Sequence, residues 1–542
     1  MDFKKTYLSN LRGDLFGGIT AGIVALPLAL AFGVASGLGA EAGIYGAIAI
    51  GIIAAIFGGT PTQISGPTGP MTVVMAGIVA SMTGSPAAVL LAVILAGVFQ
   101  IIFGLLRLGT FIKYIPYPVV SGFMSGIGVI IVCLQLLPML GASVPPNVPK
   151  ALAGLPAAFS QLNVAALGLG LATIAIIYTV PRFTKVVPGA LVGLLAMTAV
   201  SVAMKLDVPR IGDIPTGLPA LQIPPFDLAI LAAVIVPALT LAALGSIDSL
   251  LTSLVADNIT RTKHDSNKEL IGQGLGNMLT GFIGGIPGAG ATMRTVINVR
   301  SGGTGPLSGV VHGLLLLAVL LGLGPLASHI PLAVLAGILV TVGIGIIDYK
   351  GVRHFLRVPK ADAVVMVVVL ALTVFVDLIQ AVALGLVMAC LIFVKRISDM
   401  SVVSPTALKG AGRSYTGEDL SEEVYDDVYV LHLEGALFFG NALPLQAQIA
   451  KLTDAKALVI DMGRTPFLDQ SGAYALSDAA LDLQDRGVKV FLANIPQQPR
   501  ELLHVTGIAP GLIPADHVLD EVNQAVRAAV GATLKSHAGS AS

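Results

Sequence analysis

The sequence predicts a polytopic α-helical membrane protein with fourteen transmembrane segments, arranged as a 7+7 inverted repeat with two half-helices, and a C-terminal cytoplasmic α/β domain. Three observations predict this fold. Hydrophobic residues make up 55% of the 542 residues and charged residues 11%, well below the roughly 25% charge of an average soluble domain. Apolar runs recur at lengths that suit membrane spans. After Arg396 the composition becomes typical of a soluble domain.

The apolar runs divide into two sets of seven. They cover residues 15–37, 42–57, 71–82, 87–106, 119–140, 164–180 and 186–205 in the first set, and 228–255, 270–286, 292–299, 307–323, 332–347, 361–376 and 381–394 in the second. The third run of each set is short, and such a correspondence is the sequence mark of an inverted repeat. The predicted domains are a cytoplasmic N-terminus at 1–12, a first repeat at 13–206, an extracellular linker at 207–225, a second repeat at 226–396, a linker at 397–427, the α/β domain at 428–530 and a disordered tail at 531–542.

The distribution of basic residues supports this topology. An odd number of segments in each half places the halves in opposite orientations. With the N-terminus in the cytoplasm, the outer connections hold only Lys150, Lys205 and Arg210, and the other basic connections are cytoplasmic, as the positive-inside rule requires. The even total places the C-terminal domain in the cytoplasm as well.

The two short runs begin directly after helix-breaking residues, in Gly66-Pro67-Thr68-Gly69-Pro70-Met71 and Gly288-Ala289-Gly290-Ala291-Thr292-Met293-Arg294. A helix that begins inside the bilayer aims unpaired backbone N–H groups and a partial positive charge into the protein, which suits an anion. An arginine among apolar segments costs about 2.5 to 3.5 kcal/mol on insertion scales, so we expect Arg294 to face a cavity or a partner. A position at the membrane edge is the alternative.

We therefore predict that the two half-helix starts form a binding site for a small anion. The predicted substrate-binding residues are Thr68, Gly69, Ala291, Thr292, Met293, Arg294, Ala29 and Leu30. The threonines supply hydroxyl groups and Arg294 supplies charge. Ala29 and Leu30 are included because Pro27 can break the first helix and let it approach the same place, although a kink unrelated to the substrate explains this proline equally well.

Two carboxylates are candidates for coupling transport to a cation. Asp248 and Thr252 are four residues apart on one helix face, where their oxygens could ligate a small hard cation such as sodium. An Asp248–Arg294 ion pair that neutralises both charges is the alternative. Glu41 could carry a proton with the anion if it is buried, whereas a place in a short extracellular loop would give it no such role.

The C-terminal domain shows alternating strand and helix patterns. We predict strands at 428–433, 457–462 and 488–495 and helices at 471–484, 500–505 and 520–530, which together imply a small α/β layer. This part carries no nucleophile–base set, metal-ligand spacing or nucleotide loop, which argues against an enzyme. The basic residues form no stripe with aromatic residues, which argues against nucleic-acid binding.

Several motifs resemble one protein family. They are Gly13-Asp14-Leu15, Ala25-Leu26-Pro27, Gly43-Ile44-Tyr45-Gly46, Gly66-Pro67-Thr68, Ser266-Asn267-Lys268-Glu269-Leu270 and Arg294-Thr295. Together with the C-terminal domain they resemble the sulfate permease (SulP) proteins, the bacterial branch of solute carrier family 26, which end in a STAS domain. The segment Gly290-Ala291-Thr292-Met293 is most similar to the sodium-dependent bicarbonate transporters of cyanobacteria.

This resemblance implies a core domain that carries the substrate past a gate domain, and a homodimer in the inner membrane of a bacterium. It also implies that backbone oxygens near Gly290 and Ala291 complete a sodium shell. In the STAS domain it implies a phosphorylated serine at Ser471 and a regulatory partner that binds this domain. Helix capping is the alternative role of Ser471.

Two positions leave the substrate open. The similar bicarbonate transporters lack an arginine at the position of Arg294, and many relatives carry Glu at the position of Asp248. We expect secondary active transport of a small oxyanion, bicarbonate or sulfate, by alternating access and with sodium or protons as the coupled cation. A proton-coupled dicarboxylate transporter for a fumarate-like substrate, and an anion channel or exchanger, are the alternatives. No cofactor other than sodium is expected.

Overall fold

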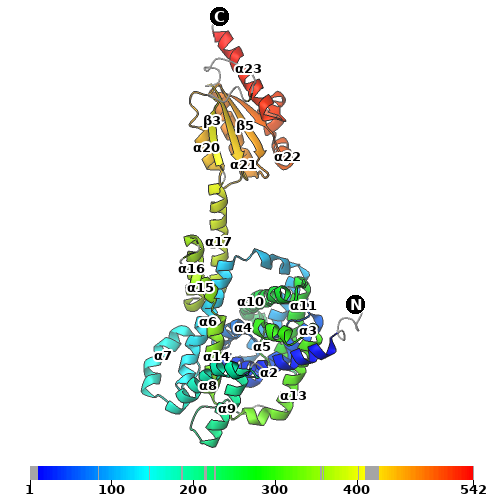
Figure 1. Ribbon diagram of the computed structural model, residues 1–542, viewed down its shortest axis with the longest axis vertical. Helices are drawn as coiled ribbons and strands as arrows, with labels where there is room; N and C mark the ends of the chain where they lie inside the picture. Colours follow the sequence, from blue (N-terminus) through cyan, green and yellow to red (C-terminus); the bar gives the residue numbers. More distant parts are fainter. Residues whose placement is uncertain are drawn as a thin grey trace. The chain divides into compact units, whose positions relative to one another are not determined.

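The computed structural model describes residues 10–82, 85–145, 147–184, 187–212, 217–224, 228–354, 357, 359–376, 378–400, 402–408, 415 and 427–540. The chain divides into two compact units, Met1–Ala389 and Cys390–Ser542, and each is described by itself (Figure 1). The first unit is helical and the second is an α/β unit.

Each of the fourteen expected apolar runs lies on a helix. In chain order these helices are α2 (Leu11–Ala35), α3 (Ala40–Phe57), α4 (Gly69–Ser81), α5 (Pro86–Leu105), α6 (Tyr117–Met139), α8 (Val164–Phe183), α9 (Gly189–Ala203), α10 (Leu228–Thr260), α11 (Ser266–Phe282), α12 (Thr292–Arg300), α13 (Leu307–Ala327), α14 (Leu332–Ile346), α16 (Lys360–Phe375) and α17 (Leu378–Met400). In the described part of the chain, seven helices are long and apolar enough to cross a bilayer, and four more are apolar but shorter. This arrangement is consistent with fourteen segments that include short ones.

Three further helices lie in the connections between these segments. They are η1 (Leu108–Tyr114), α7 (Val148–Ser160) and α15 (Tyr349–His354). The helix α7 was not predicted from the sequence. Asn147 caps this helix by accepting a hydrogen bond from the backbone N–H of Lys150, and its buried residues Val148 and Ala151 pack beside Ile130 of α6.

The helices of the first unit form two groups. In one group, α11 packs on α3 and α5, α13 packs on α2 and α3, and α10 packs on α5; in the other, α6 packs on α14 and α16, and α8 packs on α9 and α14. Figure 1 shows α8 and α9 on one side of the unit and α3, α11 and α13 on the other. The groups meet where α2 and α4 contact α6, α9 and α14. They correspond to the core and the gate that the family resemblance implies.

Small residues bring the core helices close together. A Cβ atom on Gly97 of α5 would lie 2.5 Å from the carbonyl oxygen of Gly274 of α11, and a Cβ atom on Gly274 would lie 2.5 Å from the carbonyl oxygen of Gly97. The two backbones therefore touch with no side chain between them, which is how small residues allow close packing of membrane helices.

Two short strands pair with each other inside the core group. β1 (Ser65–Gly66) pairs antiparallel with β2 (Ala289–Gly290), with Ser65 opposite Gly290 and Gly66 opposite Ala289. Each strand is followed within a few residues by a short helix, α4 at Gly69 and α12 at Thr292. The helix-breaking residues thus end an extended segment inside the bundle, and both half-helices begin where the sequence predicts.

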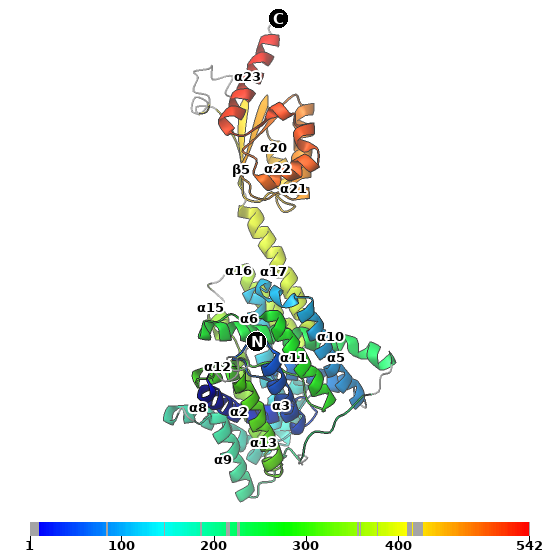
Figure 2. The same ribbon diagram turned by 90° about the vertical axis from the view of Figure 1, so that its right-hand side faces the viewer.

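The second unit contains a five-stranded sheet in the order β3 (Val402–Ala407), β4 (Val428–Glu434), β5 (Ala457–Arg464), β6 (Lys489–Ala493) and β7 (Val518–Leu519). β3 is antiparallel to β4, and the other neighbours are parallel. The helices α20 (Ala442–Ile449), α21 (Gln470–Asp485) and α22 (Gln497–Val505) share one apolar cluster with the sheet. The helix α23 (Val522–Ser540) packs on the other face (Figure 2).

Three features of this unit differ from the predictions. The strand β3 lies inside the predicted linker 397–427, and α20 and β7 were not predicted from the sequence. The prediction of a disordered tail from residue 531 is wrong as far as Ser540, because α23 continues to that residue. Thr533 lies inside this helix, where it is 2% exposed and its hydroxyl donates to the carbonyl oxygen of Ala529.

Candidate functional site

The starts of the two half-helices face the interior of the first unit. Neither helix N-terminus has a side-chain cap, so the first backbone N–H groups of each helix are available to a ligand. Thr68 and Gly69 are buried at the start of α4. At the start of α12, Thr292 is exposed and Met293 is 57% exposed. The site therefore has an open side at α12.

Hydrogen bonds join α12 and the residue before it to the extended segment 62–64, which leads to α4. The backbone N–H of Ala291 donates to the carbonyl oxygen of Ile64 at 2.9 Å, and the N–H of Ile64 donates to Oγ1 of Thr295 at 3.0 Å. Further along α12, Nδ2 of Asn298 donates to the carbonyl oxygen of Thr62 at 2.9 Å. These bonds join the two half-helices into one structural element.

Arg294 lies inside this element. Arg294 is 2% exposed, and its Nη2 atom donates a hydrogen bond to the carbonyl oxygen of Pro67 at 2.5 Å. Its Nη1 atom has no hydrogen-bond partner among the described residues and lies so close to Gly66 that a Cβ atom there would be 2.6 Å away. A place at the membrane edge is therefore wrong for Arg294, and one of its guanidinium nitrogens is buried without a hydrogen-bond partner in the described part of the chain.

Asp248 and Thr252 share one face of α10, as their spacing predicts. Thr252 donates from Oγ1 to the carbonyl oxygen of Gly290 at 2.9 Å, and the same atom lies 2.7 Å from Oγ1 of Thr292. Asp248 is 7% exposed, and its Oδ2 atom has no hydrogen-bond partner in the described part of the chain. Two hydroxyl groups and one carbonyl oxygen thus meet between α10 and the start of α12, and the carboxylate of Asp248, one turn earlier on α10, interacts with Thr68 and Arg294.

The Asp248–Arg294 ion pair is not formed as a direct contact. The two groups interact electrostatically, but none of the salt bridges among the described residues joins them. Each therefore keeps an unpartnered polar atom, Oδ2 of Asp248 and Nη1 of Arg294. Buried polar groups without partners are costly, and this arrangement is typical of a site that is completed by its ligands.

For Ala29 and Leu30, two of the predicted substrate-binding residues, the described contacts lie between helices. Ala29 and Leu30 are each 1% exposed in α2. The carbonyl oxygen of Ala29 faces Gly43 of α3, and Leu30 lines a separate apolar cavity of about 570 Å³ with Leu194 of α9. The contacts of both residues are explained by helix packing.

Glu41 lies in the first turn of α3 and is half-buried. Its carboxylate folds back over Gly39, where a Cβ atom would lie 2.5 Å from Oε1. No described contact joins Glu41 to Arg294 or Asp248.

Ser471 is exposed in the first turn of α21 and does not cap this helix. The cap is Asp469, whose Oδ1 atom accepts from the backbone N–H of Gly472 at 2.7 Å. The capping role predicted for Ser471 is wrong because Asp469, two residues earlier, occupies the N-cap position.

Buried polar groups that the sequence did not predict lie behind the site. Ser249 accepts at Oγ from the N–H of Gly290 at 3.0 Å. Gln63, Ser253, Glu269 and Gln273 form a connected set beside it. The available signal was the carboxylate of Glu269 directly before an apolar run.

The sequence profile of the sulfate permease family matches residues 11–398, and that of the STAS domain matches residues 420–525. The chain belongs to the sulfate permease family. The bicarbonate transporter BicA of Synechocystis sp. is 42% identical to it over 539 residues, which are 97% of this chain and 95% of that protein. As a family member, the chain is a multi-pass membrane protein for anion transport, with a STAS domain, and not an enzyme.

Two solved structures are similar to this sulfate permease. One is the transmembrane domain of a cyanobacterium bicarbonate transporter BicA, with 51% identity and a TM-score of 0.65; the match covers 69% of this chain and 98% of that chain. The other is murine solute carrier 26 family member A9, an anion transporter in the inward-facing state, with 21% identity and a TM-score of 0.84 over 97% of this chain and 92% of that chain. The second likeness shows the fold.

Proposed function

We propose that this sulfate permease is a secondary active transporter that moves a small inorganic oxyanion, bicarbonate or sulfate, by alternating access. The observation that carries the proposal is the meeting of two uncapped half-helix starts across β1 and β2, with the Arg294 guanidinium buried between them. Helix N-termini and a fixed positive charge favour an anion. The similarity to BicA supports bicarbonate, and the family supports sulfate.

The anion would bind between the starts of α4 and α12. Backbone N–H groups at Gly69, Thr292 and Met293 would donate to its oxygens. The hydroxyl of Thr68, which makes no direct hydrogen bond in the described part of the chain but interacts with the carboxylate of Asp248, would donate as well. Arg294 would supply the balancing charge from behind the helix starts, through the nitrogen that has no partner.

A cation is the second substrate in this proposal. Asp248, Thr252, Thr292 and the carbonyl oxygen of Gly290 offer oxygen donors, which hard cations such as sodium prefer. A sodium ion there would replace the hydrogen bond between Thr252 and Gly290. The residues fit such an ion because the Oδ2 atom of Asp248 is buried without a partner. Protonation of Glu41 is the alternative source of coupling.

Alternating access would move the core group against the gate group. The contact between α4 and α6 lies next to the anion site, so a small displacement there changes access to it. We also propose a homodimer in the inner membrane of a bacterium, with the N-terminus and the STAS domain in the cytoplasm. Phosphorylation of the exposed Ser471 or binding of a regulatory partner would then act from the cytoplasm.

The test is uptake of labelled bicarbonate, sulfate and fumarate into proteoliposomes with a sodium gradient, a proton gradient or no gradient. Sodium-driven accumulation of bicarbonate or sulfate supports the proposal and the cation site at Asp248. Proton-driven accumulation of fumarate supports a dicarboxylate symporter instead. An anion current without accumulation of any of the three would identify a channel and contradict the proposal.

A further inference from the structure

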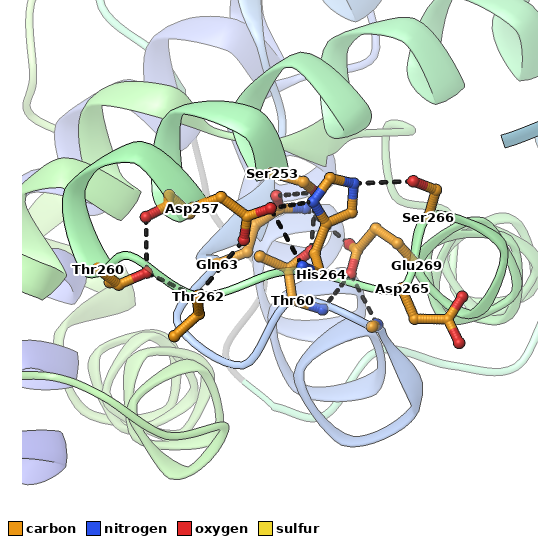
Figure 3. Close-up of polar contacts among 12 residues, drawn as sticks. Thr60, Gln63, Ser253, Asp257, Thr260, Thr262, His264, Asp265, Ser266 and Glu269 are labelled. Atoms are coloured by element: carbon orange, nitrogen blue, oxygen red, sulfur yellow. Dashed lines mark hydrogen bonds and ion pairs between the residues drawn. The ribbon is translucent and has the colours of Figure 1, made fainter. Parts of the chain in front are cut away.

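Glu269 is a buried carboxylate that the proposed transport cycle does not use directly. It lies in the first turn of α11 and is 1% exposed. Its Oε2 atom accepts from the backbone N–H groups of Gly59 and Thr60 at 2.8 and 2.9 Å. Its Oε1 atom accepts from the Nε2 atoms of Gln63 and Gln273 at 2.7 and 2.8 Å. Figure 3 shows Thr60 and Gln63 beside Glu269.

All four donors to Glu269 are neutral. No salt bridge to Glu269 occurs among the described residues. With both glutamine amides in the orientation described, a protonated carboxyl group would place its own hydrogen against one of the four N–H donors, so this arrangement favours the ionised form. Hydrogen bonds to a charged acceptor are stronger than neutral ones. Glu269 is therefore the centre of a strong and directional set of bonds.

The segment that Glu269 holds leads into the first half-helix. The hydroxyl of Ser253 donates from Oγ to Oε1 of Gln63 at 3.0 Å. Oγ1 of Thr60 lies 2.7 Å from Oγ of Ser253. Gln273 donates from Nε2 to Oγ of Ser65 at 2.6 Å. One carboxylate thus connects α11, α10 and the segment 59–65 (Figure 3).

The hydrogen bonds around Glu269 reach two residues, Ser253 and Ser65, that lie next to the proposed cation ligands Thr252 and Gly290. Ser253 is the neighbour of Thr252 in α10, and Ser65 is the residue of β1 that pairs with Gly290. Since Gly290 also accepts from Thr252, a shift of the segment 59–65 relative to α10 would change the spacing of the site's own ligands.

We infer that Glu269 is a positioning residue: its carboxylate fixes the segment 59–65 against α10 and so sets the distance between the two half-helix starts. Glu269 touches neither substrate. The inference deepens the proposed function and rests on it for the transport readout, whereas its geometric part can be measured without transport.

The first test variant is Glu269→Gln in the full chain. The new amide keeps the size of the side chain but turns one oxygen into a donor that faces the Nε2 atoms of Gln63 and Gln273. Loss of a hydrogen bond to a charged group should raise the KM for the transported anion about tenfold or more. Amide hydrogen exchange in nanodiscs should become faster in residues 59–66 and 289–295, and unchanged in the STAS domain.

The matched control is Asp265→Asn at the start of the same helix. Asp265 uses its carboxylate only as a helix cap, accepting from the N–H groups of Asn267 and Lys268, and asparagine serves as a cap equally well. The KM and the exchange rates of this variant should equal those of the wild type.

A rescue variant separates positioning from a general need for charge at residue 269. In the double variant Glu269→Gln with Gln63→Glu, the new amide at position 269 donates to the new carboxylate at position 63, and its oxygen still accepts from Gly59 and Thr60. Gln273 can turn its amide over, because its Oε1 atom has no partner among the described residues. The KM and the exchange of residues 289–295 should return toward wild-type values.

Three results would overturn the inference. One is an unchanged KM and unchanged exchange in folded Glu269→Gln protein. Another is faster exchange throughout the chain, including the STAS domain, with only the maximal rate of uptake lowered. The third is a folded double variant without rescue. If Glu269→Gln is not recovered folded, Gln63→Leu, which removes one donor, replaces it and should raise the KM in the same direction.

The failure of the proposed function would look different. Wild-type protein would then take up none of the tested anions, and the hydrogen-exchange comparison alone would decide whether Glu269 positions the half-helices.

Discussion

The Nη2 atom of Arg294 donates a hydrogen bond to the carbonyl oxygen of Pro67, although the two residues lie 227 positions apart in the chain. Arg294 belongs to α12, and Pro67 lies directly before α4. The same guanidinium that we assign to the anion thus also ties the second half-helix to the first. Loss of this side chain should therefore affect both the charge and the geometry of the site.

We expect Arg294→Ala to reduce anion uptake about 10- to 150-fold, because a hydrogen bond from a charged group contributes about 1.5 to 3 kcal/mol. Arg294→Lys should recover little activity, since an ammonium group cannot reproduce the planar fork. Uptake into proteoliposomes, normalised to inserted protein, measures both variants. Wild-type uptake by Arg294→Ala would show that the anion binds elsewhere.

Gly69 marks a contact between the core and the gate that we expect to limit transport. A Cβ atom on Gly69 would lie 2.7 Å from Cδ1 of Ile131 in α6 and 3.0 Å from Cδ1 of Ile346 in α14. Gly69→Val should therefore slow uptake by about 5- to 150-fold, because overpacking such a contact costs about 1 to 3 kcal/mol. Additional Ile131→Ala should restore part of the rate.

The control for this prediction is Gly77→Ala in the same helix, where a Cβ atom would meet nothing within 4 Å. Its initial rate of uptake should match the wild type. Equal rates for Gly69→Val and Gly77→Ala would mean that this contact does not limit the transport cycle.

Sodium dependence should require the hydroxyl of Thr252. Thr252→Val removes an oxygen that lies between Gly290 and Thr292, so sodium should no longer stimulate uptake, whereas Thr252→Ser should remain sodium-dependent. Asp248→Asn should behave like Thr252→Val. The measurement is the initial rate of uptake against sodium concentration. If Asp248→Asn instead lowers yield and stability at every salt concentration, the carboxylate serves the fold and not a cation.

A pH-dependent contribution to stability should come from Asp348, in the connection between α14 and α15. Burial raises the pKa of Asp348, but hydrogen bonds from Ser121 and Tyr117 outweigh it and leave the pKa below its ordinary value. A lowered pKa stabilises the folded state above the unfolded value of about 3.9 and loses this effect as pH falls through the folded pKa.

Tyr117→Phe removes one of these donors. It should lower the unfolding temperature at pH 7, and the difference from wild type should shrink below about pH 4. Thermal unfolding of the detergent-solubilised protein at several pH values checks this. A difference that stays constant across this range would attribute the effect to packing of the tyrosine.

The start of α21 should depend on Asp469 and not on Ser471. Asp469→Ala removes the N-cap, which costs about 1 kcal/mol, and should speed hydrogen exchange in the first turn of α21. Ser471→Ala should leave the exchange unchanged because this side chain is exposed and does not cap the helix. The opposite pattern would return the capping role to Ser471.

The sequence predicted those parts of the site that depend on local chemistry. The starts of α4 and α12 were predictable because glycine and proline prevent a helix from continuing through residues 66–67 and 288–290. The common face of Asp248 and Thr252 followed from helical spacing. The bond from Arg294 to Pro67 and the bonds to Glu269 from Gly59, Thr60 and Gln63 were not predictable, because they join segments more than 200 residues apart. Only the bond from Gln273, four residues further along α11, follows from helical spacing.

In the second unit, the sequence predicted the buried parallel strands better than the edges. β4, β5 and β6 carry apolar runs that stand out from their surroundings. β3 lies in a stretch predicted as a linker, and β7 has two residues, too few for a recognisable alternation. The prolonged α23 shows that a small-residue, polar composition does not by itself indicate disorder.

The pairing of β1 with β2 has a consequence for the ancestry of the fold. One strand and one half-helix come from each half of the chain, so a single half could present only half of the anion site. An ancestor that consisted of one repeat would have needed a second copy, inserted in the opposite direction, to bind the same ion. Gene duplication and fusion would then have preserved a binding site that already existed between two polypeptides.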